Sequence, residues 1–173
     1  METTLATSAT RRRESSPSRN TPSREPNGTP AILYTSGNAD CHIILRGGSQ
    51  PNYDAASVDA ASAELIRSGV TPRIMIDTSH ANSSKKPENQ PLIAADIARQ
   101  LAGGDARIMG VMIESNLVAG RQDVLPGVAL TYGQSITDGC IDWETTVRAL
   151  NVLADAVEAR RGLVRRAFSE RSA

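Results

Sequence analysis

IMIDTSHANSSK, residues 74–85, is the stretch of sequence that decides the fold of this chain. It opens with three apolar residues, which predict a short buried strand over residues 74–76. A carboxylate, an imidazole and several hydrogen-bonding side chains follow directly. The stretch is therefore typical of a strand that delivers polar groups to one edge of a sheet.

Two further segments have the same character. CHIILRGG, residues 41–48, ends in Arg46 and two glycines, and IMGVMIES, residues 108–115, ends in Glu114 and a serine. In each segment an apolar run, which predicts a strand, is followed by a polar group. Three such strands predict consecutive βα units of a barrel, with a site at the carboxyl ends of the strands.

Helical stretches separate and follow these strands. One is predicted over residues 55–68 after the N-cap Asp54, and a second is predicted to open at Pro91 and to stop at Gly103. Asp142 is predicted to cap a long last helix, with apolar positions at helical spacing: Trp143, Val147, Leu150, Ala154 and Val157. Alternating strands and helices, with strands that are apolar on both faces, favour an α/β fold with a parallel sheet.

Residues 1–30 differ in composition from the remainder. They are rich in Ser, Thr, Arg and Pro and contain almost no large apolar side chain, so we expect a disordered tail. A targeting segment is the alternative reading of the Arg-rich stretch, although acidic residues and the lack of an amphipathic stripe weigh against it. The expected division is a tail over residues 1–30 and a barrel part over residues 31–173.

Overall composition excludes some classes of partner. The formal net charge is zero, which gives no indication of nucleic-acid binding, and no apolar run approaches the roughly 20 residues of a membrane span. Two cysteines, Cys41 and Cys140, without a secretory context favour a reducing compartment. A cytoplasmic protein with no nucleic-acid or membrane partner is the expectation.

Three polar residues form a candidate metal site. Glu114 directly follows an apolar strand, where an unpaired carboxylate would be costly to bury. Taken alone, His80 is more often structural and Asp138 reads as a turn residue. Taken together, one imidazole and two carboxylates suit a divalent transition metal such as Mn, Fe, Co or Zn. Structural roles for all three stay open at this point.

Arg46 is a candidate anion-binding residue. Its guanidinium stands beside Gly47 and Gly48, whose backbone amides can approach a ligand closely, which suits a phosphate or a carboxylate. The alternative is an arginine paired with a neighbouring acid. The polar residues after the second strand either orient His80, contact a substrate or cap the loop: Ser79, Asn82, Ser83 and Ser84.

Six motifs together resemble one enzyme family: TSGNADCHIILRGG, PNYD, MIDTSHANSSK, GVMIES, YGQSITDGCIDWE and AVEARRG. They are similar to the C-terminal part of class I 3-deoxy-D-arabino-heptulosonate 7-phosphate (DAHP) synthase, over about residues 31–162. That family condenses phosphoenolpyruvate with erythrose 4-phosphate and releases inorganic phosphate, as the first step of the shikimate pathway. The resemblance implies a partial (β/α)₈ TIM barrel that holds roughly the last three βα units.

The resemblance also implies roles for individual residues. His80, Glu114 and Asp138 match three of the family's four metal ligands, and catalytic roles fall on His80 and Asp138. Arg46 matches an arginine that holds the phosphate of phosphoenolpyruvate. Residues expected to line the same mouth are Asp77, Ser79, Asn82 and Ser83.

Parts of the family's site that have no match in this sequence lead to two hypotheses for the chain. Its fourth metal ligand is a cysteine on a strand without a counterpart here, and Cys41 and Cys140 match other positions. The first hypothesis is a truncated synthase that acts as a homo-oligomer or with a complementing chain. The second is a catalytically inactive fragment that binds a full-length synthase.

Overall fold

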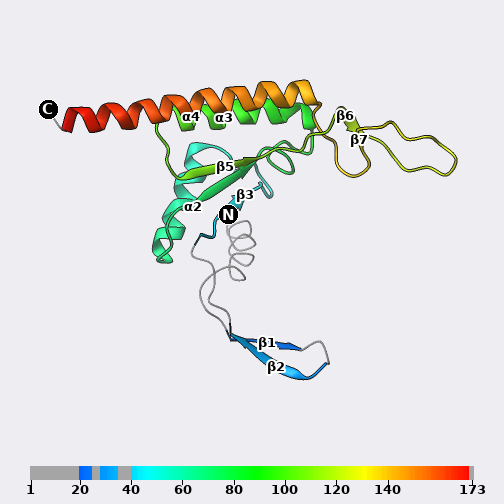
Figure 1. Ribbon diagram of the computed structural model, residues 1–173, viewed down its shortest axis with the longest axis horizontal. Helices are drawn as coiled ribbons and strands as arrows, with labels where there is room; N and C mark the ends of the chain where they lie inside the picture. Colours follow the sequence, from blue (N-terminus) through cyan, green and yellow to red (C-terminus); the bar gives the residue numbers. More distant parts are fainter. Residues whose placement is uncertain (1–19, 25–27, 35–39, 172–173) are drawn as a thin grey trace. The chain divides into compact units, whose positions relative to one another are not determined.

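The computed structural model describes residues 20–24, 28–34 and 40–171 (Figure 1). These fall into two units, Met1–Ile43 and Ile44–Ala173. In the first unit, strands β1 (Asn20–Arg24) and β2 (Pro30–Tyr34) pair in antiparallel register. Gly28, with a φ of 84°, provides the left-handed backbone needed between them.

This strand pair lies partly in the segment expected to be a disordered tail. Residues 20–24 and Pro30 of that segment belong to paired strands. The polar sequence of β1, NTPSR, can pair with β2 because the ladder bonds are made by the backbone. Residues 1–19 and 25–27 lie outside the described residues, and the division into tail and barrel part stays a prediction.

A three-stranded sheet forms the centre of the second unit. Its order is β3 (Ile43–Leu45), β4 (Ile74–Asp77) and β5 (Ile108–Met112), and β4 runs parallel to β5. All three strands were predicted from their apolar runs. The largest fully buried apolar side chains are Leu45, Val58, Ile74, Ile76, Ile97 and Ile108. The core is therefore built from the strands and from the helices that connect them.

Two helices connect the strands. α2 (Ala55–Arg67) begins after Asp54, whose Oδ1 accepts a hydrogen bond of 3.0 Å from the backbone of Ser57. α3 (Gln90–Ala102) follows a single 3₁₀ turn, η1 (Pro87–Asn89). The α3 residues that face the core are Ile93, Ala94, Ile97, Ala98 and Leu101. Within the described residues, no helix combines the length and apolar character needed to cross a membrane.

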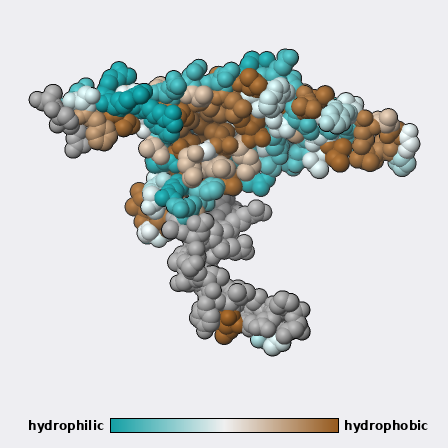
Figure 2. Space-filling view, in the orientation of Figure 1, coloured by the Kyte–Doolittle hydropathy of each residue, from teal (hydrophilic) through white to brown (hydrophobic). Residues whose placement is uncertain are grey.

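Between β5 and the last helix the chain forms a projecting arm. Its base consists of two short strands, β6 (Val118–Arg121) and β7 (Gln134–Ser135). Figure 2 shows hydrophobic side chains gathered on this arm, where the exposed residues include Val124, Leu125, Val128, Leu130 and Tyr132. An exposed group of this kind is typical of a surface that contacts another protein.

The last helix, α4 (Trp143–Arg171), packs against α3 with a different face from the one predicted. Its cap is as expected, since Asp142 Oδ1 accepts a 2.7 Å hydrogen bond from the backbone of Thr145. The buried positions, however, are Thr146, Ala149, Leu153 and Ala156. At 100° per residue, this stripe lies about 100° around the helix from the predicted one.

The predicted stripe is left largely exposed. Trp143, Val147 and Leu150 are 58%, 37% and 50% exposed. The reason is steric: Ala149 and Ala156 are small enough for α4 to lie close to α3, whereas the large side chains of the other stripe would hold the helices apart. α4 is thus apolar over two adjacent faces, and α3 covers one of them.

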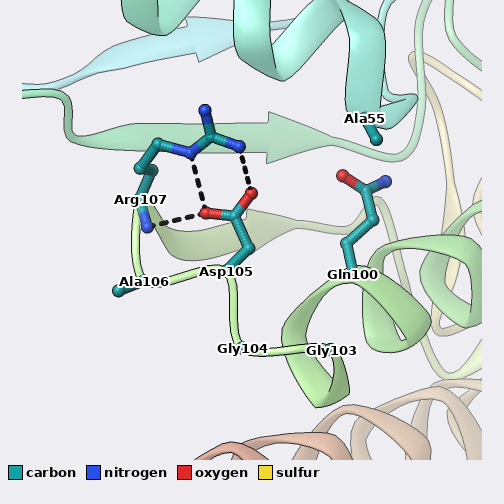
Figure 3. A pocket seen from close by; sticks show the side chains of 7 residues that line it. All are labelled: Ala55, Gln100, Gly103, Gly104, Asp105, Ala106 and Arg107. Carbon is teal, nitrogen blue, oxygen red and sulfur yellow. Dashed lines mark hydrogen bonds and ion pairs between the residues drawn. The ribbon is translucent and has the colours of Figure 1, made fainter.

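At its amino end, β5 is held by a charged cluster (Figure 3). Arg107 Nη2 lies 2.6 Å from Asp105 Oδ2 and 2.7 Å from Asp59 Oδ1 on α2. Hydrogen bonds from Arg107 hold the pKa of Asp105 below its usual value, and the two carboxylates raise the pKa of Arg107. The cluster borders an open cavity of about 390 Å³, which lies at the amino end of β5 and not at the carboxyl ends of the strands.

We expect the variant Asp105→Asn to lower the free energy of unfolding by about 1–2 kcal/mol at pH 7. Because the folded-state pKa of Asp105 is lowered, this contribution is present above the ordinary carboxyl pKa of 3.8 and is lost as the pH falls below it. Urea unfolding of both proteins at several pH values measures the difference. A difference that grew on acidification would contradict the assigned ion pair.

The packing of α4 is tested by a matched pair of leucine variants. Leu153→Ala removes a buried side chain and should lower the free energy of unfolding by about 2–4 kcal/mol. Leu150→Ala alters the exposed stripe and should change it by less than about 0.5 kcal/mol. Urea unfolding measures both free energies, and a larger loss for Leu150→Ala than for Leu153→Ala would mean that α4 packs with the adjacent face.

Candidate functional site

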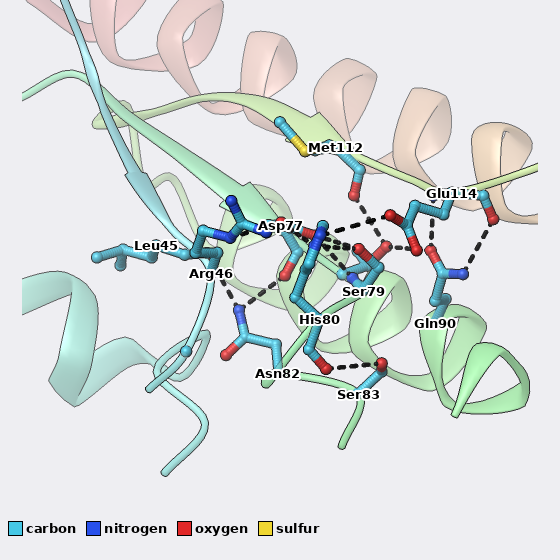
Figure 4. A network of polar contacts seen from close by, with 12 residues as sticks. Leu45, Arg46, Asp77, Ser79, His80, Asn82, Ser83, Gln90, Met112 and Glu114 are labelled. Carbon is cyan, nitrogen blue, oxygen red and sulfur yellow. Dashed lines mark hydrogen bonds and ion pairs between the residues drawn. The ribbon is translucent and has the colours of Figure 1, made fainter. Parts of the chain in front are cut away.

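A buried amide joins the ends of β3 and β4. Asn82 Nδ2 donates to Leu45 O at 3.1 Å and to Asp77 O at 2.7 Å, and its Oδ1 accepts from Asn52 N at 2.8 Å (Figure 4). The last residues of both strands thus lie at the same edge. Buried backbone groups that lie beyond the end of the sheet ladder still need hydrogen-bond partners, and the side chain of Asn82 is the partner here.

A second buried amide holds the end of β5. Gln90, the first residue of α3, donates from Nε2 to Glu114 O at 3.0 Å and accepts from Glu114 N at 2.9 Å. Thr78 Oγ1 lies 3.0 Å from Gln90 Oε1 and 2.9 Å from Met112 O. Glu114 is therefore fixed by its backbone, two residues beyond the end of β5.

The loop after β4 has an unusual backbone. His80, Ser84 and Lys85 have φ values of 50°, 55° and 58°, in the left-handed region that side chains other than glycine disfavour. A hydrogen bond of 2.8 Å from Lys85 N to His80 O closes the loop. Strain of this kind persists where surrounding contacts enforce it and is typical of functional sites.

Gly47 packs against this loop. A Cβ atom at this position would lie 2.8 Å from the backbone nitrogen of Asn82, and the φ of 75° is itself in the left-handed region. Only glycine meets both conditions without displacing the loop. Gly47 therefore allows close approach between two loops.

Asp77 is fully buried and organises the imidazole of His80. Its Oδ1 accepts from Ser79 N at 2.8 Å and from Ser79 Oγ at 2.7 Å. Its Oδ2 accepts no well-aligned hydrogen bond within the described part of the chain, but it lies 2.7 Å from His80 Nδ1 and 3.8 Å from Arg46 Nε. Arg46 therefore supplies a positive charge, and His80 an N–H group, beside a carboxylate that would be costly to bury alone.

Ser79 and Asp77 together set the tautomer of His80. Ser79 Oγ donates to Asp77 Oδ1 at 2.7 Å and lies 2.6 Å from His80 Nδ1. Because the hydroxyl has one proton, it accepts from Nδ1, which favours the proton on that atom and leaves the lone pair of Nε2 free. Nε2 faces Glu114 Oε1 at 3.5 Å. A metal-binding histidine is usually supported in this way, since one ring nitrogen bonds to a polar partner and the other stays free for the metal.

His80, Glu114 and Asp138 come together at the carboxyl ends of the strands. One ligand atom from each lies within 4.8 Å of the others. They border a cavity of about 110 Å³ whose lining residues are Ser79, His80, Ser83, Lys85, Pro87, Gln90, Glu114, Asp138 and Gly139. One nitrogen and two carboxylate oxygens fit a divalent metal such as Mn, Fe, Co or Zn, and three protein ligands leave positions for water or substrate.

Asp138 reaches the cavity because its loop is tied to the segment after β5. Ile141 N donates to Glu114 O at 3.1 Å, and Asn116 N donates to Ile141 O at 3.0 Å. These bonds form a parallel bridge between Ser115 and Ile141. A residue that reads as part of a turn in the sequence is thereby placed beside two strand-end residues.

The residues expected to line the mouth occupy two different positions. Ser79 and Ser83 border the cavity. Asp77 and Asn82 are not among the lining residues, and their polar atoms contact neighbouring protein groups. Arg46 is 47% exposed beside Asp77.

Cys140 lies close to the candidate ligands. Burial raises the pKa of its thiol, and the charges of Glu114 and Asp138 raise it further.

Sequence reasoning missed Gln90 and Asn52. Both act on residues 24 or more positions away, and neither belongs to an apolar strand. A buried glutamine directly before a helix-opening proline was the available signal for Gln90, because a polar residue at such a position needs a partner.

We expect Asn82→Ala to lower the free energy of unfolding by about 2–4 kcal/mol, because it leaves the carbonyls of Leu45 and Asp77 without this donor. Asn116→Ala is the matched control, since Asn116 Oδ1 accepts one exposed bond from Leu117 N, and it should cost under about 1 kcal/mol. Urea unfolding compares the two, and equal losses would argue against a joining role for Asn82.

Comparison with known proteins identifies the family. The family model described as the DAHP synthetase I family matches residues 4–151. Phospho-2-dehydro-3-deoxyheptonate aldolase, Phe-sensitive, of Escherichia coli K12 is 53% identical over 135 residues, which are 78% of this chain and 39% of that protein. The Haemophilus influenzae phospho-2-dehydro-3-deoxyheptonate aldolase is also 53% identical, over 78% of this chain and 37% of its own length.

A solved structure agrees with these relatives. Phospho-2-dehydro-3-deoxyheptonate aldolase from Francisella tularensis SCHU S4 superposes with a TM-score of 0.77 at 45% identity, covering 84% of this chain and 42% of that chain. The chain thus spans about two fifths of the relatives it matches. The family match begins at residue 4, so it includes most of the segment that composition set apart as a tail. This chain belongs to the DAHP synthetase I family.

Proposed function

We propose that the chain forms part of the active site of a 3-deoxy-7-phosphoheptulonate synthase, a transferase that joins phosphoenolpyruvate to erythrose 4-phosphate. The observation that carries the proposal is the convergence of His80, Glu114 and Asp138 beside a cavity at the strand ends. Membership of the DAHP synthetase I family supports the same reaction. The product would enter the pathway to aromatic amino acids.

In this proposal, the second unit is a portion of a (β/α)₈ barrel, roughly its last three βα units. Strand order β3-β4-β5, with a helix after β3 and after β4, supports this assignment. α4 then follows the short β7 as the last helix. A site at the carboxyl ends of the strands is where barrel enzymes bind their substrates.

The proposed ligands of the divalent metal are His80, Glu114 and Asp138. A metal held there would act as a Lewis acid that polarises the aldehyde of erythrose 4-phosphate. The residues of this chain orient the site: Asp77 fixes the ring of His80, and Ser79 bonds to Asp77. His80 and Asp138 are the proposed catalytic residues because they border the reacting atoms.

Arg46 is the proposed anchor for the phosphate of phosphoenolpyruvate. Its Nε is directed to Asp77, and its half-exposed guanidinium keeps further N–H donors for an anion. Ser79 and Ser83 are placed to contact substrate in the cavity. Asp77 and Asn82 take a supporting role in this proposal, since their polar atoms already bond to the protein.

The reaction balances without a further reactant. C3 of phosphoenolpyruvate bonds to the aldehyde carbon of erythrose 4-phosphate, whose oxygen takes up a proton. Water adds at C2, the bond from C2 to the phosphate oxygen breaks, and inorganic phosphate leaves as C2 becomes a ketone. Holding the two anionic substrates together removes much of the entropic barrier to their meeting.

A second candidate function is that of a catalytically inactive fragment that binds a full-length synthase. The exposed stripe of α4 and the apolar arm between β6 and β7 favour it, because they offer surface for another protein. Under the first candidate, the same surfaces would serve a homo-oligomer or a complementing chain. A cytoplasmic location stays an expectation under both.

We expect the purified chain, mixed with a polypeptide covering the remainder of a relative's sequence, to consume phosphoenolpyruvate when Mn²⁺ and erythrose 4-phosphate are present. Glu114→Ala should reduce the rate at least about a hundredfold, because it removes a ligand of the Lewis acid. Glu88→Ala is the control, as Glu88 is an exposed carboxylate on η1 outside the cavity lining, and it should keep the rate.

Turnover that survives Glu114→Ala would refute the assigned metal site. A folded wild-type chain that binds a full-length synthase but gives no turnover in any mixture would favour the second candidate. Absorbance of phosphoenolpyruvate at its ultraviolet band and size-exclusion chromatography provide the two readouts.

A further inference from the structure

We propose that Gln90 is a positioning residue for the metal ligand Glu114: its buried amide fixes the backbone of Glu114 and thereby the direction in which the carboxylate enters the site. The inference rests on the proposed metal site and deepens it. Gln90 lies on α3, and neither a pattern in the sequence nor its residue type assigns it to the site.

The bonds of Gln90 replace a strand partner. The β4–β5 register ends with the pair Asp77 and Met112, so Glu114 lies beyond the last paired residue. Gln90 contacts both backbone polar groups of Glu114, accepting from N at 2.9 Å and donating to O at 3.0 Å. This is the two-bond pattern that a neighbouring strand would supply.

The amide of Gln90 has one favourable orientation. Its Oε1 accepts from Glu114 N, and its Nε2 donates to the carbonyl of Glu114. A rotated amide would set like groups against each other at both contacts, whereas the hydroxyl of Thr78 can donate or accept and fits either orientation. Because Gln90 is 1% exposed, water offers no replacement for these bonds.

Fixing the backbone of Glu114 matters because its side chain has few other restraints. Glu114 Oε1 lies 3.5 Å from His80 Nε2, and the carboxylate is 25% exposed at the cavity. Ile141 N also donates to Glu114 O, but Glu114 N donates to Gln90 Oε1. Loss of that bond would let the carboxylate shift within the cluster, and metal affinity would fall. Residues that hold metal ligands in place typically contribute about 10–100-fold to affinity.

Gln100 provides a matched control on the same helix. Its Nε2 donates to Tyr53 O at 2.9 Å, so it too joins α3 to a distant backbone carbonyl. It lines the other cavity, beside Gly103 and Arg107 (Figure 3). The same substitution at both positions therefore separates a general loss of packing from an effect on the metal site.

The test measures Mn²⁺ affinity of the full chain by isothermal titration calorimetry. Gln90→Asn shortens the side chain by one methylene, so that the amide no longer reaches Glu114, and should weaken Mn²⁺ binding about 10–100-fold. Gln100→Asn should change it by less than about threefold. A change below threefold for Gln90→Asn, or equal losses in both variants, would overturn the inference.

A double-mutant cycle tests whether the effect runs through Glu114. In a Glu114→Gln background, Gln90→Asn should weaken Mn²⁺ binding by less than about threefold, because the ligand that it positions is already lost. A purely structural role would instead give the full loss again in that background. Additive losses therefore count against the inference.

If Gln90→Asn fails to fold, Thr78→Val takes its place. This variant removes the hydroxyl that lies between Gln90 Oε1 and Met112 O and should weaken Mn²⁺ binding about threefold to tenfold, against less than about threefold for Gln100→Asn. Unchanged affinity would overturn the inference. If the folded wild-type chain binds no Mn²⁺, the proposed metal site itself fails, which is distinct from the failure of Gln90 to act on it.

Discussion

The structure of the site depends on one constraint, which is that backbone groups at the buried ends of strands must find hydrogen-bond partners after the sheet ladder has stopped. Asn82 meets this need for β3 and β4, and Gln90 meets it for the segment after β5. These two amides set how far the strand ends lie from one another. The loops that they hold carry His80 and Glu114, so the positions of the candidate ligands follow from how backbone groups are satisfied.

A buried charge adds the second requirement. Asp77 has no access to solvent, so it must be compensated by Ser79, His80 and Arg46. That compensation orients the imidazole and holds the guanidinium beside Asp77. The same carboxylate thus links the proposed metal site to the proposed phosphate anchor. Left-handed backbone at three residues of the loop is the cost of this compact arrangement.

Outside the site, the described residues carry two areas of exposed apolar surface. α4 is covered by α3 on one apolar face and exposes the adjacent one, and the arm between β6 and β7 carries several exposed apolar side chains. Both features have the same physical meaning, which is apolar surface that would be stabilised by burial.

The sequence by itself determined the three strands of the central sheet and the helix caps at Asp54 and Asp142, because these follow from local patterns of apolar and polar residues. It identified His80 and Glu114 as candidates for the same edge, since parallel strands end together. Only the tertiary structure decided which face of α4 is buried, because the buried stripe has smaller side chains and includes Thr146, so polarity alone does not mark it. Only the tertiary structure brought Asp138 beside Glu114 and Gln90 onto its backbone, since hydrogen bonds across 24 residues leave no periodic trace in the sequence.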